Sequence, residues 1–239
     1  MLDIGACTCG EDWPDRLECL TSFNRHVAHD VGGSLVTMAG AAKLARQALD
    51  QGDSAMAARL LPMLETKADD LHRLVTELMV LAEADAPMQR QPVDLNALAA
   101  SALDEVRLGP HAAPNAVVQV DPLPVAHGSP ALLRQVFVNL MTNSLKFSRE
   151  RERPHVHVSE STTQGRLSIC VQDNGVGFAP HQAKHLFQPF SRLHGAAYAG
   201  HGIGLCFVRR VVERHGGQVW ALPLAPHGAA FHFSLPGTA

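Results

Sequence analysis

The sequence has few aromatic residues and lacks the features that mark several protein classes. Aromatic residues make up 5% of its 239 positions and apolar residues 46%, and the formal net charge is −3, an ordinary soluble composition. No apolar run approaches the length of a membrane span, and the N-terminus lacks a signal-peptide pattern. No basic block indicates a nucleic-acid partner. We therefore expect a cytoplasmic protein with one large domain or two small ones.

Cysteine is also scarce. The five cysteines are too few and too scattered for a disulfide framework. Cys170 and Cys206 fall in apolar segments and are expected to be small buried residues. Cys7 and Cys9 could ligate a metal or respond to redox state, but a flexible leader over residues 1–15 is the simpler interpretation, and we assign the pair no role.

Two long amphipathic helices are predicted in the first third of the chain. Apolar residues recur every three or four positions over residues 16–50, and leucines do so over residues 60–81. Gln51-Gly52-Asp53-Ser54 separates the two helices, and Pro62 would delay or bend the second. One hairpin cannot bury both apolar stripes, so two chains are expected to pair into a four-helix bundle over residues 16–86. The sequence thus predicts a homodimer.

His29 is the candidate reactive side chain of the first helix. It lies two residues from both Val27 and Val31, so at about 100° per residue it points away from the apolar stripe. Asp30 follows it, and a carboxylate beside a solvent-facing imidazole orients the ring and raises its basicity. This pair suits a phosphate acceptor. His26, expected nearer the apolar side, is the alternative among fourteen histidines.

Two glycine clusters occur in the second half of the chain. Asp173-Asn174-Gly175-Val176-Gly177-Phe178 follows an apolar strand, so one carboxylate and two glycines stand where the backbone can turn and admit a flat ring. Gly200-His201-Gly202-Ile203-Gly204-Leu205 opens a helix, where free N–H groups and the helix dipole favour phosphate. Either cluster alone could be an ordinary turn. Together they indicate a nucleotide pocket.

Asn139, Asn143 and Lys146 form a third polar element. Their spacing places them on one face of a helix over residues 130–147, with apolar residues on the opposite face. Amide oxygens suit Mg²⁺, and a lysine suits phosphate. A solvated stripe is the alternative, but asparagine is a poor choice for a helix interior.

The rest of the sequence predicts an α+β fold. Residues 87–94 read as a polar, proline-containing linker, and Asp94 caps a helix to about Leu108. Strands are expected at residues 117–120, 156–158, 167–171, 218–222 and 229–235, the last two as a terminal hairpin. The N-terminal helical hairpin is thus followed by an α/β sandwich over residues 95–239, with a mixed sheet covered on one face by helices.

These motifs carry a family resemblance. Asn139-x-x-x-Asn143, Asp173-x-Gly175-x-Gly177, Phe187-Gln188-Pro189-Phe190 and Gly200-x-Gly202-x-Gly204-Leu205 resemble, in order, the N box, first glycine box, F box and second glycine box of sensor histidine kinases. The resemblance covers roughly residues 95–235. It implies binding of ATP and Mg²⁺ by a domain of the Bergerat type.

The resemblance also implies a role for each residue. Asp173 would accept a hydrogen bond from the adenine amino group, Asn143 would hold Mg²⁺ with Asn139 in support, and Lys146 would contact phosphate. Gly175, Gly177, Gly200, Gly202, Gly204 and Leu205 would shape the nucleotide site. Phe187 and Phe190 would couple a lid over ATP, up to Tyr198, to the phosphotransfer helix.

The segment around His29 resembles the H box of the dimerisation and phosphotransfer domain. The resemblance implies that His29, followed by Asp30, is phosphorylated by ATP and passes the phosphoryl group to an aspartate of a response-regulator receiver. The family usually has a proline after the acidic residue, whereas this chain has Gly32-Gly33, a pair that costs about 2 kcal/mol in a helix. Gly33 replaces the polar residue that the family uses in dephosphorylation.

Two alternatives are weighed against a histidine autokinase. ATPases of the same sandwich fold, and anti-sigma-factor kinases, place a glutamate at the first N-box position, where this chain has Asn139 and therefore no general base for hydrolysis. A catalytically weak, kinase-like ATP-binding scaffold acting through partners is favoured by Gly32-Gly33 and by the missing proline. The residues before the first helix are too few for a folded sensor, so we expect a separate sensor protein or a longer parent chain.

Overall fold

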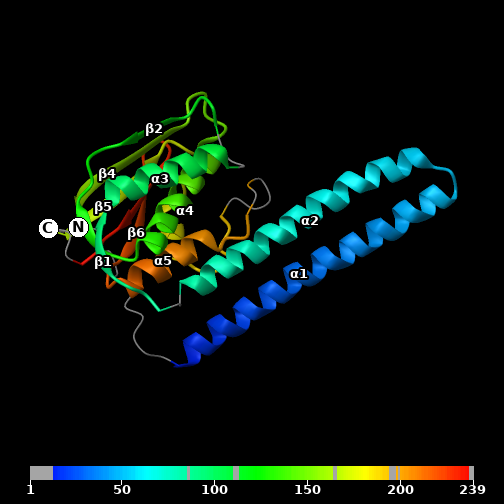
Figure 1. The fold of residues 1–239 in the computed structure, drawn as a ribbon, viewed down its shortest axis with the longest axis horizontal. Helices are drawn as coiled ribbons and strands as arrows, with labels where there is room; N and C mark the ends of the chain where they lie inside the picture. Colours follow the sequence, from blue (N-terminus) through cyan, green and yellow to red (C-terminus); the bar gives the residue numbers. More distant parts are fainter. Residues whose placement is uncertain are drawn as a thin grey trace. The chain divides into compact units, whose positions relative to one another are not determined.

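The computed structural model describes residues 13–84, 87–109, 113–163, 166–193, 198 and 200–236 (Figure 1). The chain divides into two compact units between Arg73 and Leu74. The predicted boundary lay after residue 86. Cys7 and Cys9, with most of the expected leader, lie outside the described residues.

The first unit is a helical hairpin. Helix α1 (Trp13–Asp50) and helix α2 (Ser54–Glu83), whose last residues belong to the second unit, run antiparallel (Figure 1). Gly52, with φ of 78°, makes the turn, and the carboxylate of Asp53 accepts a hydrogen bond from the Met56 N–H (2.9 Å), which caps α2. Small residues near the turn, Ala45, Ala48 and Ala57, are buried and let the two backbones approach.

The structure adds detail to the expectations for the hairpin. Helix α2 begins at Ser54 and contains Pro62, so the proline does not delay it. His26 and His29 are both exposed in the single chain. The glycines do not interrupt α1, which is helical through Gly32 and Gly33.

The second unit is the predicted sandwich. Its five-stranded sheet has the order β2-β4-β5-β7-β6, in which β2 and β4 are parallel and the other neighbours antiparallel, so the sheet is mixed as expected. The strands are β2 (Val117–Val120), β4 (His155–Thr163), β5 (Arg166–Asp173), β6 (Val219–Pro223) and β7 (Ala229–Phe233). Helices α3 (Leu95–Leu108), α4 (Pro130–Ser148) and α5 (Gly204–Arg214) cover one face (Figure 1). The α+β prediction is confirmed.

The core lies between the sheet and α4. Phe137 of α4 packs edge-to-face on Phe233 of β7, with ring centroids 5.6 Å apart. Leu133, Leu140 and Leu145 are buried on the same side of α4, as their spacing predicted. This packing fixes the opposite, polar side of α4.

The sequence prediction missed a second, small sheet. Residues 91–94, expected to be linker, form β1 (Gln91–Asp94), which pairs antiparallel with β3 (Val125–Gly128). Only Val93 of β1 is buried, so no alternation marks the strand in the sequence. A 3₁₀ helix, η1 (Pro180–His185), was also missed.

The cysteine and capping predictions were tested as well. Asp94 accepts a hydrogen bond from the Asn96 N–H (2.9 Å), which confirms it as the N-cap of α3. Cys170 is buried as expected, whereas Cys206 is only half-buried. Among the residues described, no helix has the length and apolar character needed to cross a membrane.

Candidate functional site

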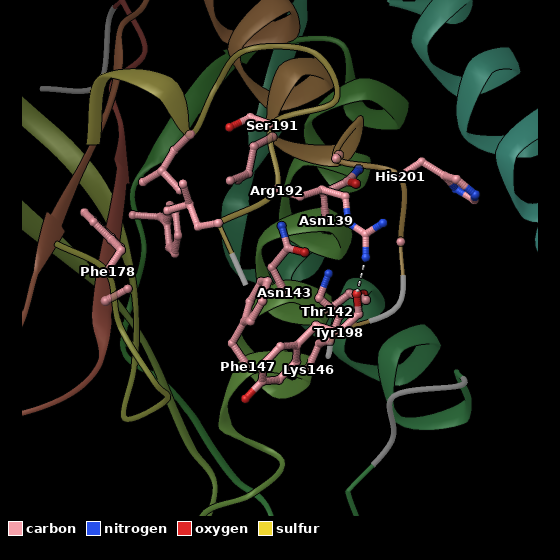
Figure 2. A pocket seen from close by; sticks show the side chains of 18 of the residues that line it. Asn139, Thr142, Asn143, Lys146, Phe147, Phe178, Ser191, Arg192, Tyr198 and His201 are labelled. Carbon is pink, nitrogen blue, oxygen red and sulfur yellow. Dashed lines mark hydrogen bonds between the residues drawn. The ribbon is translucent and has the colours of Figure 1, made fainter. Parts of the chain in front are cut away.

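A cavity of about 300 Å³ lies beside the polar side of α4, within the second unit. Its walls come from α4, the end of β5, the segment 186–193 and the residues before α5 (Figure 2). Nine of the predicted nucleotide-site residues line it: Asn139, Asn143, Lys146, Asp173, Gly177, Gly200, Gly202, Gly204 and Leu205. Motifs far apart in the sequence thus meet in one site.

The carboxamides of the N box lie on the same side of α4 (Figure 2). The Asn139 Nδ2 donates to the Gln135 backbone oxygen at 2.9 Å, one turn earlier. Its Oδ1 lies against Gly204, where a Cβ would approach to 2.6 Å. Asn139 therefore joins α4 to the start of α5 and leaves Asn143 as the N-box carboxamide available to a ligand.

Asp173 stands at the C-terminal end of β5 and is 3% exposed. Burial raises the pKa of its carboxyl to about 6, although the N–H groups of Gly175 (2.8 Å) and Ala229 partly offset this effect. The side chain is thus mostly ionised at neutral pH, and is a buried hydrogen-bond acceptor that lines the cavity. This is the geometry that base recognition requires.

Lys146 lies in the cavity at the far end of the N box. Burial lowers the pKa of its ammonium group to about 8; the carboxylate of Glu77 opposes this effect, while Arg192 and Arg149 add to it. A cation held with so little compensating charge favours an anionic ligand. Phosphate is the natural candidate.

The backbone before α5 can lie close to a ligand because its glycines carry no side chain, and a side chain would not fit at these positions. Gly202 has φ of 75°, and a Cβ there would lie 2.7 Å from the Ser191 backbone oxygen. Its carbonyl accepts a hydrogen bond from the Phe190 N–H at 3.1 Å, which joins the glycine segment to the F box. Residues 200–203 are neither helix nor strand, and Gly200, His201 and Gly202 line the cavity.

Three predicted nucleotide-site residues do not line the cavity. Gly175 packs against the Phe147 backbone, where a Cβ would approach to 2.6 Å. Phe187 is buried and meets the Phe231 ring edge-to-face, with centroids 6.5 Å apart. Phe190 supports Gly202 through its backbone. These residues shape the site from behind rather than facing a ligand.

An aromatic column at the edge of the cavity was missed. The Phe147 ring lies 4.9 Å from that of Tyr198, with the Lys146 ammonium 4.4 Å from the Phe147 centroid and the Arg149 guanidinium 4.7 Å from the Tyr198 centroid. Arg192 donates to the Tyr198 backbone oxygen at 3.1 Å (Figure 2). Phe147 directly follows Lys146 in the sequence, but nothing local links it to Tyr198.

His29 and Asp30 lie on α1 in the first unit, where His29 is exposed and Asp30 is half-buried. The imidazole Nδ1 is 3.1 Å from the Asp30 Oδ1, and the His29 side chain is 85% exposed. The predicted pairing of imidazole and carboxylate is therefore present. Because Nδ1 faces Asp30, the other nitrogen, Nε2, faces solvent.

Comparison with known proteins supports this description. Residues 128–239 match the family described as histidine kinase-, DNA gyrase B-, and HSP90-like ATPase. The chain is 30% identical over 234 residues to the adaptive-response sensory-kinase SasA of Prochlorococcus marinus (92% of this chain, 59% of SasA). It is 26% identical over 225 residues to the sensor protein kinase WalK of Staphylococcus epidermidis (90% of this chain, 36% of WalK). The chain thus spans less than two thirds of either relative.

Solved structures agree. The histidine kinase named ShkA, solved full-length in complex with AMPPNP, is 26% identical with a TM-score of 0.60, over 78% of this chain and 40% of ShkA. ThkA, a histidine kinase solved in complex with the response regulator protein TrrA, has a TM-score of 0.70 at 19% identity, over 94% of this chain and 64% of ThkA, and supports the fold alone.

Residues 128–239 thus match this ATPase family. Together with the relatives that extend over both units, this match supports the catalytic core of a sensor histidine kinase. The resemblance inferred from the boxes is confirmed.

Proposed function

We propose that the chain is an ATP-dependent protein-histidine autokinase that phosphorylates His29 and passes the phosphoryl group to an aspartate of a response regulator. The observation that carries the proposal is one cavity that combines a buried carboxylate, an N-box carboxamide and a lysine. An exposed imidazole–carboxylate pair stands on a helix of the same chain.

The base end of the site favours adenine. The ionised Asp173 accepts a hydrogen bond from the exocyclic amino group, whereas guanine would present a carbonyl oxygen there and repel the carboxylate. Gly177 lines the same end of the cavity without a side chain. ATP is therefore the proposed phosphoryl donor.

The phosphate end would be held by Lys146 and the N–H groups before α5. No cluster of three His, Cys, Asp or Glu side chains among the described residues could bind a metal alone. Mg²⁺ fits as an ion held jointly by the Asn143 amide oxygen and nucleotide phosphates, which it would neutralise. Lys146 and the backbone orient the phosphate chain for in-line transfer.

The geometry of His29 supports Nε2 as the nucleophile. In the tautomer that suits this role, the Nδ1–H donates a hydrogen bond to Asp30, which leaves the lone pair on the solvent-facing Nε2. Nε2 forms a bond to the γ-phosphorus as the bond to the β,γ-bridging oxygen breaks, and ADP leaves with that electron pair. The same phosphorus is then attacked by an aspartate of the receiver, which restores the imidazole.

Hydrolysis by this site is disfavoured. The first N-box residue is Asn139, whose amide already bonds to the Gln135 backbone oxygen and cannot act as a base. Dephosphorylation of a partner is likewise not proposed, because Gly33 supplies no side chain and its carbonyl accepts from Thr37 Oγ1 at 2.8 Å.

A homodimer through residues 16–86 is part of the proposal. Large apolar side chains remain exposed on both helices of one chain, including Leu35 (51%), Val36 (75%), Leu61 (51%) and Met63 (56%). A four-helix bundle of two hairpins would cover them. A response regulator is the proposed second partner, because the phosphoryl group on His29 needs an acceptor aspartate. A cytoplasmic location stays a prediction.

Incubation with γ-labelled ATP and Mg²⁺ tests the proposal. Wild type should take up acid-labile, alkali-stable label, and both His29→Gln and Asn143→Ala should fail to do so. His29→Gln should still bind ATP, because it loses only the phosphate acceptor. His26→Gln, also on α1 and exposed, is the matched control and should retain label. Wild-type protein that binds ATP but takes up no label would contradict the autokinase and favour the scaffold.

A further inference from the structure

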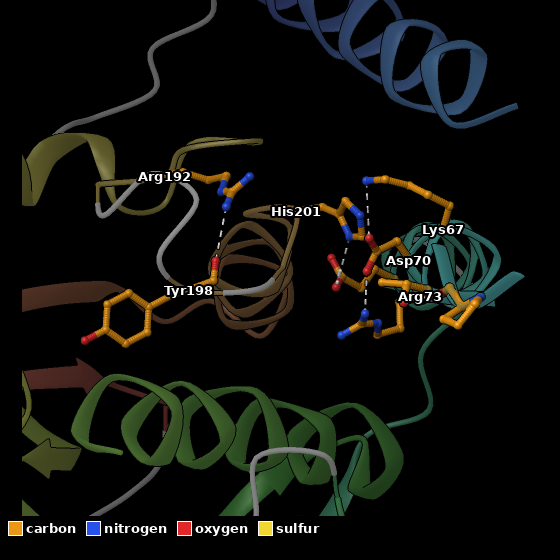
Figure 3. Close-up of polar contacts among 9 residues, drawn as sticks. Lys67, Asp70, Arg73, Arg192, Tyr198 and His201 are labelled. Atoms are coloured by element: carbon orange, nitrogen blue, oxygen red, sulfur yellow. Dashed lines mark hydrogen bonds and ion pairs between the residues drawn. The ribbon is translucent and has the colours of Figure 1, made fainter. Parts of the chain in front are cut away.

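Glu77 is the one side chain of α2 that lines the nucleotide cavity in the described part of the chain. Its Oε1 lies 3.4 Å from Nδ1 of His201, the residue between the first two glycines of the second box. The two side chains are 33% and 19% exposed, so both are partly withdrawn from solvent. Figure 3 labels His201 and marks its ion pair with a dashed line, and Figure 2 shows His201 directed away from the other labelled cavity residues.

The same carboxylate acts on the phosphate end of the cavity. Burial disfavours the charged form of Lys146, and Glu77 supplies the opposing negative charge, whereas Arg192 and Arg149 repel the ammonium group. In the nucleotide-free protein, Glu77 therefore supplies part of the negative charge near Lys146 that a bound phosphate would supply. The Glu77 carboxylate thus contacts the glycine segment at His201 and acts electrostatically on Lys146, and both Glu77 and Lys146 line the cavity.

A bound polyphosphate would compete with this arrangement. It carries several negative charges to the lysine and glycine segment that Glu77 already faces, and like charges in a partly buried site repel. Either the Glu77 carboxylate moves out of the phosphate site, or the affinity for the polyphosphate falls. The nucleobase, bound at Asp173, would not be affected.

We propose that Glu77 is a resting counter-ion of the phosphate site, which holds His201 and the second glycine box in the nucleotide-free protein and is displaced by nucleotide polyphosphate. The inference rests on the proposed function of the cavity. Glu77 is a positioning residue in this proposal and takes no part in the chemical step.

Binding of ATP, ADP and adenosine, measured by calorimetry at pH 7.0, tests this proposal. That pH lies between the pKa of Asp173, about 6, and that of Lys146, about 8, so both groups are mostly charged. Glu77→Gln should bind ATP and ADP more tightly, on the order of three- to tenfold for one like charge removed, and adenosine as wild type does. High salt should reduce the difference in ATP affinity between Glu77→Gln and wild type.

Two further variants separate electrostatics from structure. Glu83→Gln removes an exposed carboxylate of the same helix that does not line the cavity, and should leave all three affinities unchanged. Glu77→Asp keeps the charge on a shorter side chain, and its affinity for ATP should lie between those of Glu77→Gln and wild type. Thermal melts of each variant check folding.

Each outcome either supports or overturns the counter-ion role of Glu77. Unchanged or weaker ATP binding by Glu77→Gln overturns the counter-ion role while the proposed function stands. An equal change for adenosine, or the same change in Glu83→Gln, also overturns it. If neither wild type nor Glu77→Gln binds any of the three ligands, the proposed function fails as well. ATP binding that appears only in Glu77→Gln supports both.

Discussion

Replacing Asp173 by asparagine should stabilise the protein and abolish ATP binding. Burial raises the pKa of this carboxyl from 3.8 to about 6, so the folded protein binds the proton more tightly than the unfolded chain does. Stability therefore falls as the pH rises through this interval. A tenfold change in an ionisation constant corresponds to about 1.4 kcal/mol, so the charged carboxylate costs about 3 kcal/mol at pH 7 and about half as much at pH 5.

Asparagine removes this cost and keeps an oxygen that can accept the Gly175 N–H. Its amide N–H groups, however, can point toward the adenine amino group, and two hydrogen-bond donors that face each other cannot bond. Urea denaturation at pH 5 and pH 7 should show Asp173→Asn more stable than wild type, with the larger gain at pH 7, while calorimetry shows ATP binding lost. Asp104→Asn, which removes an exposed carboxylate of α3, is the control and should change stability little. A variant less stable than wild type at pH 7, a gain equal at both values of pH, or retained ATP binding would refute the reasoning.

The phosphate end and the glycines allow further tests. Because the pKa of Lys146 is about 8, ATP affinity of wild type should fall as the pH rises above that value, and Lys146→Gln should bind weakly with little change between pH 7 and pH 9, as measured by calorimetry. Gly204→Ala should reduce ATP affinity on the order of tenfold, because the new Cβ would lie 2.6 Å from the Asn139 Oδ1. Gly33→Ala meets no atom within 4 Å and should instead raise the Tm, by a gain of about 1 kcal/mol in helix stability. Equal effects of the two alanines on ATP binding would contradict this account of the second box.

Local sequence patterns predicted most of the fold and one wall of the site. The spacing of Asn139, Asn143 and Lys146 fixed their common face because apolar residues on the opposite side of α4 are buried. Asp173 could be placed because a short apolar run ended directly before it. In both cases the pattern that allowed the prediction lies within a few residues along the chain.

What the sequence could not predict depends on distant contacts. Phe187 could equally have lined the cavity or the core, and only Phe231 of β7, which it contacts, decides for the core. The approach of Tyr198 to Phe147, and of His201 to Glu77, follows from how separate segments fold back on α4 and α2. Strand β1 was missed because a single buried residue cannot show a period.

The position of β5 has a consequence for inhibition of the proposed kinase. This strand lies at the centre of the five-stranded sheet, paired on both sides, so Asp173 is attached to the least deformable part of the unit. Residues 200–203, proposed to face phosphate, lie in neither helix nor strand. A competitive compound anchored on Asp173 would meet a fixed target, and a resistance mutation that removes this anchor would also remove the group proposed to recognise ATP.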